Sequence, residues 1–215
     1  MGNIHSQNDM ASVARPGHFN DPDMLQIGNI GLTLTEQYTH MTLWCIAGAP
    51  LLAGTDLVHA SNDTLAILAN VEVTAIDQDL GKNGAIQGRL VTRSAWARPD
   101  SSDADPVRSD RPHFPVPSHL LILNWQVVVG QEASTEVWVK LLADGKSAAI
   151  ALVNLGDDPA ASSEVTFADA GLPSGVSQAK VRDLWRKEDL GTESGRIAAK
   201  DVPSHGSVFL KLTWD

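Results

Sequence analysis

The chain has 215 residues, of which 43% are hydrophobic and 20% are charged. This composition is typical of a globular protein of one or two domains, and it excludes disordered, collagen-like and coiled-coil classes. Its 16 basic and 26 acidic residues give a formal net charge of −10, so we expect binding neither to nucleic acid nor to an anionic membrane. The one cysteine, Cys45, excludes an internal disulfide and a zinc site built from several thiolates.

The first residues of the chain carry no targeting signal that we can identify. They lack the basic and apolar regions of a secretory signal, so we expect no signal peptide in this chain. The longest apolar stretch, residues 43–53, is too short to cross a bilayer. The opening sequence is more typical of the middle of a protein than of its beginning.

In chain order, residues 1–17 are mostly polar, and we expect an irregular N-terminal segment that ends in an Arg-Pro-Gly turn. Phe19 is expected to close a short strand, which Pro22 then breaks into a loop. Thr33 and Glu36 have the spacing of a capping box, and the apolar residues after them recur at helical spacing. This pattern predicts a helix over about residues 34–47, ended by Gly48 and Pro50.

Residues 50–54 are apolar throughout and predict a buried parallel strand. Ser61 is a good N-cap for a helix to about Asn70, and Val73 and Ile76 suggest a further short turn. The order strand, helix, strand, helix predicts two β/α units, and such units form parallel sheets covered by helices. Two units cannot close a (β/α)₈ barrel, which needs about 250 residues, so this region is typical of the last piece of a larger domain.

After residue 84 the pattern changes to short runs that alternate with period two. Asp144-Gly145 is a strong hairpin signal between two of them. The predicted strands are residues 135–141, 148–154, 164–167, 180–185 and 207–214. They predict an antiparallel β-sandwich. Three tryptophans fall at core positions of these runs, and we expect core packing for them before sugar stacking: Trp138, Trp185 and Trp214.

An irregular insertion at about residues 95–133 interrupts this second region. Its first part is rich in proline and aspartate, and its second part is apolar enough for a strand. Structureless insertions of this length are uncommon inside compact domains. The domain prediction is therefore residues 1–83 for the β/α part and 84–215 for the sandwich that carries the insertion.

The segment Asn20-Asp21-Pro22-Asp23-Met24 is the strongest candidate for chemistry. It places two carboxylates just after a predicted strand, and active sites of α/β sheets and barrels lie at the carboxyl ends of strands. Paired carboxylates are what glycosidic cleavage requires, one as general acid and one as nucleophile or base. The alternative, which spacing alone favours, is that they accept backbone N–H groups and hold a turn. A calcium loop is a third reading, but the spacing of an EF-hand is missing.

The remaining candidates are weaker, and we expect no metal and no cofactor. The seven histidines form no metal-binding motif, and the glycines form no phosphate-binding loop. Cys45 falls on the apolar face of the predicted helix and is expected to be inert. Asp56 follows the second predicted strand, where it either functions or caps the loop to the next helix.

Residues 14–25, A-R-P-G-H-F-N-D-P-D-M-L, resemble the P-G-x-W-N-D-P-D-M-L signature of the α-galactosidases of glycoside hydrolase family 27, also named melibiases. Phe19 stands where the family commonly has tryptophan. The similarity continues at residues 32–37, 43–44, 49–57, 73–79, 136–140, 181–185 and 202–206. It leaves out about residues 95–133, and we hypothesise that this stretch is a gene-model artefact such as a translated intron.

The resemblance implies the last two β/α units of a (β/α)₈ barrel followed by an antiparallel β-sandwich. It further implies a retaining glycoside hydrolase that releases terminal α-linked galactose, with a galactoside as its partner. Asp23 and Met24 match family positions that line the galactose pocket, with Asn20 and Asp21 as possible support. The family's K-x-D-x-C-like nucleophile motif and W-R-x-x-x-D-I-like acid/base motif do not occur in this sequence. We therefore expect both catalytic Asp residues upstream of Met1 and no hydrolysis by these residues alone.

Two alternatives follow from the same resemblance. One is an α-N-acetylgalactosaminidase, because the residues that contact the sugar's C2 substituent are expected upstream. The other is a non-catalytic, galactose-binding remnant. For the intact family member, the resemblance implies an extracellular, lysosomal or vacuolar location.

Overall fold

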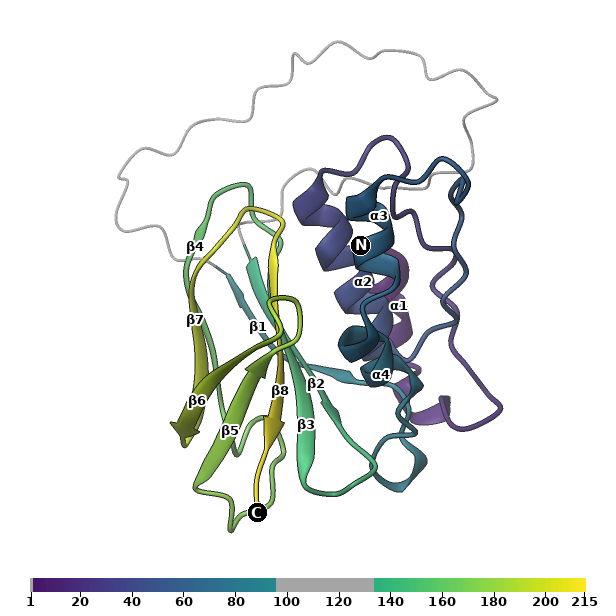
Figure 1. The fold of residues 1–215 in the computed structure, drawn as a ribbon. Helices are drawn as coiled ribbons and strands as arrows, with labels where there is room; N and C mark the ends of the chain where they lie inside the picture. The colour runs from purple at the N-terminus through teal and green to yellow at the C-terminus, as the bar shows by residue number, and fades with distance from the viewer. Residues whose placement is uncertain (1, 96–133) are drawn as a thin grey trace, which may run out of the picture.

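The computed structural model describes residues 2–95 and 134–215, so nearly all of the predicted insertion lies outside the described residues. Figure 1 shows helices on one side of a large antiparallel sheet and a smaller sheet on its other side. The described chain therefore has three layers, with the helices coming first in the sequence. This arrangement confirms the predicted combination of an α/β region and an all-β sandwich.

The helical region contains four α-helices and two short 3₁₀ helices. They are α1 (Gly2–Asn8), η1 (Ala11–Val13), α2 (Leu34–Ala47), α3 (Asn62–Leu68), α4 (Val71–Gln78) and η2 (Lys82–Gly84). The prediction of an irregular polar segment over residues 1–17 is wrong where α1 forms. Ile4 in this helix is fully buried and packs in the core. The predicted turn around Val73 is in fact the two-turn helix α4, which Asn70 caps by accepting the N–H groups of Glu72 and Val73.

Helix α2 begins and ends where the sequence predicts. The Thr33 hydroxyl accepts the N–H of Glu36, and the Glu36 carboxylate accepts the N–H of Thr33, which is a complete capping box. Gly48 ends the helix in the left-handed region, with φ of 62°. Ser61 caps α3 in the same way by accepting the N–H of Thr64. Local side-chain chemistry thus sets these helix boundaries.

The predicted parallel strands are much reduced. Leu25 and Ala53 form an isolated parallel bridge, in which Leu25 donates to the Leu52 carbonyl at 2.8 Å and accepts from Gly54 at 2.9 Å. The prediction of a buried strand at residues 50–54 is wrong in its burial, since the Leu52 side chain is 54% exposed. Within the described residues, the bridge to Leu25 is the one β-pairing that this segment makes.

The strands are β1 (Arg89–Ala95), β2 (Ser134–Leu141), β3 (Ser147–Asn154), β4 (Ala160–Thr166), β5 (Gln178–Asp183), β6 (Glu188–Ser194), β7 (Arg196–Val202) and β8 (Ser207–Thr213). The large sheet has the order β1-β2-β3-β8-β5-β6, and β4 pairs with β7 in the small sheet. The predicted hairpin is confirmed: Leu141 pairs with Ala148, and Gly145 takes a φ of 68°. The sequence missed three strands, β1, β6 and β7, of which β6 is exposed along its whole length and so shows no apolar alternation.

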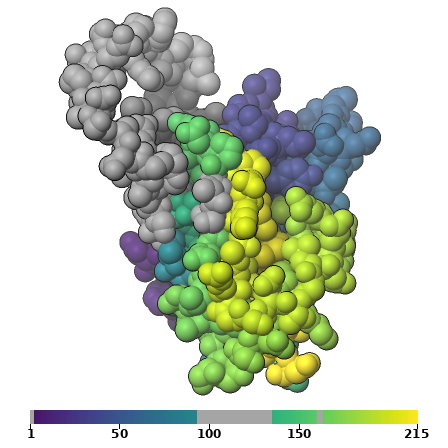
Figure 2. All heavy atoms as spheres, turned by 90° about the vertical axis from the view of Figure 1, so that its left-hand side faces the viewer, coloured from purple at the N-terminus to yellow at the C-terminus, as the bar shows by residue number. Residues whose placement is uncertain are grey.

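Strand β3 is buried on both faces and separates two apolar layers. Ala149, Ala151 and Val153 face the helices, whereas Ala148, Ile150 and Leu152 face the small sheet. Trp138 is fully buried on the helix side, and Trp214 packs in the layer between the sheets. The expected core role of the tryptophans is therefore confirmed for these two, although in different layers. Figure 2 shows the molecule from the left-hand side of Figure 1, where the later strands, in green and yellow, form most of the surface that faces the viewer.

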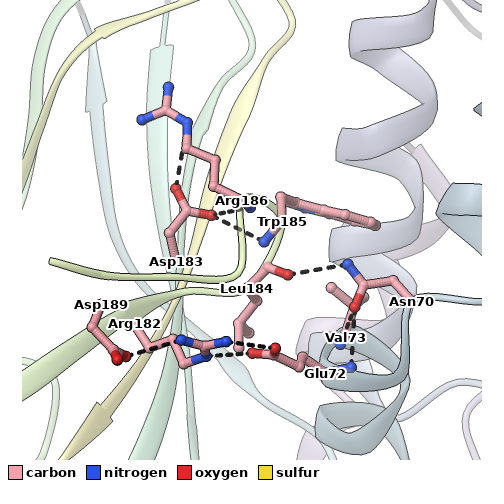
Figure 3. Close-up of polar contacts among 9 residues, drawn as sticks. All are labelled: Asn70, Glu72, Val73, Arg182, Asp183, Leu184, Trp185, Arg186 and Asp189. Atoms are coloured by element: carbon pink, nitrogen blue, oxygen red, sulfur yellow. Dashed lines mark hydrogen bonds and ion pairs between the residues drawn. The ribbon is translucent and has the colours of Figure 1, made fainter.

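Helix α4 is tied to the large sheet by polar side chains, drawn in part in Figure 3. Arg182 on β5 reaches Glu72, and the Asn70 amide donates to the Leu184 carbonyl at 3.0 Å. At the other end of α4, the buried Lys140 ammonium donates to the Ile76 carbonyl at 2.7 Å. A cation at a helix C-terminus satisfies carbonyls that have no partner within the helix. These contacts fix the helical layer on the sheet.

Candidate functional site

The candidate segment, residues 20–24, lies in the loop that precedes the Leu25 bridge. The predicted strand ending at Phe19 is not formed, because His18 pairs only with Arg15 across a tight turn. Asn20 anchors the segment: its amide donates to the Met10 carbonyl at 2.9 Å and to the Gln87 side chain at 2.6 Å. Gln87 lies two residues before β1, so Asn20 ties the loop to the start of the β region.

Both carboxylates of the segment accept backbone N–H groups. Asp21 Oδ1 accepts from Asp23 at 2.9 Å, and Asp23 Oδ1 accepts from Met24 at 2.6 Å. Both carboxylates therefore hold the turn, as the alternative interpretation predicts. This role does not exclude a ligand, because both side chains are exposed and each carboxylate offers about four lone-pair sites.

Asp23 has an unusual backbone. Its φ is 84°, in the left-handed region that favours glycine. For a residue with a side chain such a conformation costs about 1–3 kcal/mol and persists only where surrounding contacts impose it. Four other described non-glycine residues share a positive φ, namely Asn83, Lys187, Asp201 and His205, and Asp23 is the one that lies in the candidate segment. The Met24 side chain beside it is 43% exposed, and that of Phe19 is 58% exposed.

One face of α2 contacts the chain from residue 23 to residue 28. The Trp44 indole Nε1–H donates to the Asp23 carbonyl at 2.7 Å, and the Gly28 N–H donates to Gln37 Oε1 at 2.9 Å. Between them, His40 Nε2 accepts the N–H of Gln26 at 3.3 Å. Sequence reasoning missed these three side chains. Their spacing along one side of the helix is the signal that could have identified them.

His40 is suited to accept that hydrogen bond. Its ring stacks on the Trp44 indole, with centroids 3.9 Å apart and planes at 19°. Burial lowers the pKa of His40 to about 4, because the charged imidazolium would lose its water. The ring is therefore neutral at ordinary pH, and a neutral imidazole has one nitrogen free to accept.

The other candidates have structural roles. Asp56 accepts the N–H groups of Val58 and His59 and pairs with the His59 ring at 2.6 Å, so it caps its loop as one of the two readings expected. Its hydrogen bond with His59 lowers the pKa of the Asp56 carboxyl. Cys45 is fully buried, and burial raises the pKa of its thiol, which confirms the expected inert core residue.

Residues 2–95 and 134–215 contain neither a metal-binding cluster nor a membrane-spanning helix. No three His, Cys, Asp or Glu side chains in these ranges gather as a metal site would require. No helix in the same ranges has both the length and the apolar character needed to cross a membrane.

Comparison with known proteins places both regions in one family. A family model described as alpha galactosidase A matches residues 3–79, and one described as the alpha galactosidase C-terminal beta sandwich domain matches residues 132–212. The alpha-galactosidase of Cyamopsis tetragonoloba is 32% identical over 200 residues, which are 93% of this chain and 38% of that protein. The human alpha-N-acetylgalactosaminidase is 40% identical over 121 residues, covering 51% of this chain and 28% of that protein.

Among solved structures, alpha-galactosidase I of Mortierella vinacea superposes with a TM-score of 0.71 at 28% identity. The match covers 99% of this chain and 44% of that one. The chain thus spans less than half the length of these relatives. The superposition confirms the predicted fold, part of a (β/α)₈ barrel followed by the β-sandwich.

Proposed function

The chain belongs to the melibiase family of α-galactosidases, glycoside hydrolase family 27, and we propose that it supplies the C-terminal part of a retaining α-galactosidase. The enzyme would release terminal α-linked galactose from oligosaccharides or glycoconjugates. Residues 1–83 would complete its catalytic barrel, and residues 84–215 would form its β-sandwich. The observation that carries the proposal is Asp23, held in a strained conformation inside the N-D-P-D-M-L segment that the first family model covers.

Asp23 and Met24 are proposed to line the galactose pocket. A carboxylate accepts hydrogen bonds from sugar hydroxyls, and such charge-assisted bonds contribute about 1.5–3 kcal/mol each. The exposed Met24 side chain offers an apolar surface for the ring's C–H face. Asn20 and Asp21 support the pocket, since both bond to the loop backbone or to its neighbours.

Asp21 and Asp23 are not proposed as the catalytic pair. Retention requires a nucleophile and an acid/base whose carboxyl groups lie roughly 5–5.5 Å apart across the scissile bond. The motifs that the resemblance assigns to those roles do not occur in these 215 residues. We therefore propose that these residues bind and orient galactose but do not cleave its glycosidic bond on their own.

A hybrid enzyme tests the proposal. The N-terminal part of the Cyamopsis tetragonoloba relative is joined to these 215 residues, and hydrolysis of an aryl α-galactoside is measured. We expect activity in the hybrid and none in the 215 residues alone. Asp23→Asn should lower kcat/KM by about 10- to 100-fold, the equivalent of one charge-assisted hydrogen bond. Asp158→Asn, which changes an exposed carboxylate of the sandwich, should leave it unchanged.

Two results would overturn the proposal. One is hydrolysis by the 215 residues alone, which would place the catalytic pair among them. The other is an Asp23→Asn hybrid as active as its parent, which would remove Asp23 from the pocket.

The human relative supports a second candidate, an α-N-acetylgalactosaminidase. The hybrid addresses this too, with aryl α-galactoside and aryl α-N-acetylgalactosaminide compared side by side. If the C2 contacts lie outside these 215 residues, the hybrid will follow the preference of the protein that supplies its N-terminal part. A reversed preference would assign C2 specificity to the present chain.

A further inference from the structure

Helix α2 holds the candidate loop at three successive points, and the two segments run in opposite directions. Gln37, His40 and Trp44 lie on one side of the helix and bond to the backbone at residues 28, 26 and 23, respectively. The Trp44 contact is the one that reaches Asp23. It is also the shortest of the three, at 2.7 Å between the indole nitrogen and the carbonyl oxygen.

We propose that Trp44 is a positioning residue for sugar binding: its indole N–H fixes the peptide after Asp23 and thereby aims the Asp23 carboxylate and Met24 at the ligand. The inference rests on the proposed function, in which Asp23 and Met24 line the galactose pocket. Trp44 does not touch the sugar in this scheme. It acts through Asp23 only.

The physical argument starts from the strained backbone. With φ at 84°, Asp23 gains free energy if its peptide groups rotate toward an ordinary conformation. Rotation would turn the carbonyl away from the indole and move the Met24 N–H, which now bonds to the Asp23 carboxylate. The hydrogen bond to Trp44 opposes that rotation. Loss of the indole donor should therefore release the carboxylate as well as the carbonyl.

Trp44 is well suited to this role. An indole has a single hydrogen-bond donor and no acceptor, so its one polar group is committed to Asp23. The side chain is buried, and the His40 ring stacked on it limits its rotation. A phenylalanine at this position would keep the aromatic packing and remove only the N–H.

Trp185 provides a matched control. Its indole Nε1–H also bonds to α2, donating to the Thr42 hydroxyl at 2.9 Å, and its ring packs edge-on against Tyr38. Trp185→Phe thus removes the same chemical group, here one that donates to α2, without touching residues 23–28. Any effect of Trp44→Phe that Trp185→Phe reproduces is a general effect on stability.

The experiment uses the 215-residue chain labelled with ¹⁵N, as wild type, Trp44→Phe and Trp185→Phe. Two-dimensional NMR follows the amides of Asp23 and Met24 and the indole N–H signals, without sugar and during titration with galactose. We expect selective shifts of the Asp23 and Met24 amides in Trp44→Phe before any sugar is added. We also expect its Kd for galactose to rise by about fivefold or more, the equivalent of about 1 kcal/mol for one hydrogen bond. Trp185→Phe should match the wild type in both respects.

The outcomes separate the inference from the proposed function. Unchanged Asp23 and Met24 amides in Trp44→Phe, or equal losses in both variants, would overturn the positioning role. A wild type that does not respond to galactose would count against pocket binding by this chain, while the amide shifts without sugar would still decide whether Trp44 positions Asp23. If Trp44→Phe does not fold, the wild-type indole signals decide. Galactose should move the Trp44 signal and leave that of Trp185 in place, and the absence of this difference would overturn the inference.

Discussion

Arg182 on β5 and Glu72 on α4 are joined by two hydrogen bonds between charged groups. Arg182 Nε lies 2.6 Å from Glu72 Oε2, and Nη2 lies 2.8 Å from Oε1. Two parallel bonds match the planar guanidinium to the carboxylate and fix the angle at which the helix meets the sheet. The pair therefore links a helix of the barrel region to a strand of the sandwich.

Replacement of Arg182 by glutamine should lower the unfolding temperature more than the same change at Arg186. Arg186 makes a single, longer contact of 3.8 Å with Asp183, and its side chain is mostly exposed. Exposed single contacts contribute little to stability, whereas two-point pairs at an interface contribute more. Thermal unfolding of both variants tests this order. Equal effects would show that the Arg182 pair does not hold α4 on the sheet.

Gly48 should not tolerate alanine. A Cβ atom there would lie 2.6 Å from the Ile86 carbonyl oxygen, and φ at Gly48 is 62°. We expect Gly48→Ala to lower the free energy of unfolding by roughly 2–4 kcal/mol, from backbone strain and the clash together. Gly145→Ala is the control, because φ is similar at 68° and nothing lies within 4 Å of its Cβ position. It should cost only about 1 kcal/mol, and urea unfolding of both variants isolates the clash.

Asp77 should make the protein more stable in acid. Burial raises the pKa of its carboxyl to about 6 from the ordinary 3.8, and its Oδ1 makes no hydrogen bond within the described residues. Between these pH values the folded protein retains a proton that the unfolded chain has lost. The resulting stability, roughly 3 kcal/mol, is fully present below about pH 4 and is lost as the pH rises through 6.

The variant Asp77→Asn tests this pH dependence. The wild type should lose more stability than the variant between pH 4 and pH 7, as measured by urea unfolding across that range. The charge that faces Asp77 is the Lys140 ammonium, whose pKa burial lowers to about 8. Lys140 therefore stays protonated throughout the range and adds no slope of its own. Identical slopes for wild type and Asp77→Asn would contradict the prediction.

Replacement of Asn154 by aspartate should destabilise the protein more than replacement by alanine. Its buried amide donates to the carbonyls of Asp158, Val202 and Pro203, and its side-chain oxygen accepts the N–H of Gly156. Asn154→Ala leaves these groups without partners, at a cost of about 2–3 kcal/mol. Asn154→Asp instead sets a charged carboxylate against carbonyl oxygens and should cost about 4 kcal/mol or more.

A control for that comparison lies on α3. Asn62 is exposed in the first turn of this helix, where a negative charge is favourable, so Asn62→Asp should leave the unfolding temperature nearly unchanged. Thermal unfolding at pH 7 ranks the three variants. An Asn154→Asp variant no less stable than Asn154→Ala would show that the three carbonyls do not converge on the side chain.

Local patterns predicted the local structures well. Thr33, Glu36 and Gly48 fixed both ends of α2, and Asp144-Gly145 fixed the hairpin, because each is a short-range interaction that the residues themselves determine. Strands β1, β6 and β7 escaped prediction, and for β6 the reason is that it is exposed throughout. The layer that Trp138 occupies also could not be predicted, because alternation shows that one side of a strand is buried but not which layer covers it.

At the candidate site, too, local features could be predicted from the sequence and long-range contacts could not. The turn held by Asp21 and Asp23 follows from residue type and spacing. The strained backbone of Asp23 does not, because it depends on Trp44, twenty-one residues further along the chain. Contacts of this kind form only after α2 has packed beside the loop, so their one sign in the sequence is the helical spacing of residues 37, 40 and 44, which does not name the loop as their partner.

The position of β8 has a consequence for how the protein is made. It is the last strand of the large sheet in chain order, yet it lies between β3 and β5. During synthesis, β1, β2 and β3 can pair early, and β5 can pair with β6, but the two groups stay separate until β8 leaves the ribosome. Until then β3 presents an open edge, and the helix-facing layer lacks Phe209. A nascent chain stalled before β8 would therefore expose the same edge and apolar surface that chaperones recognise.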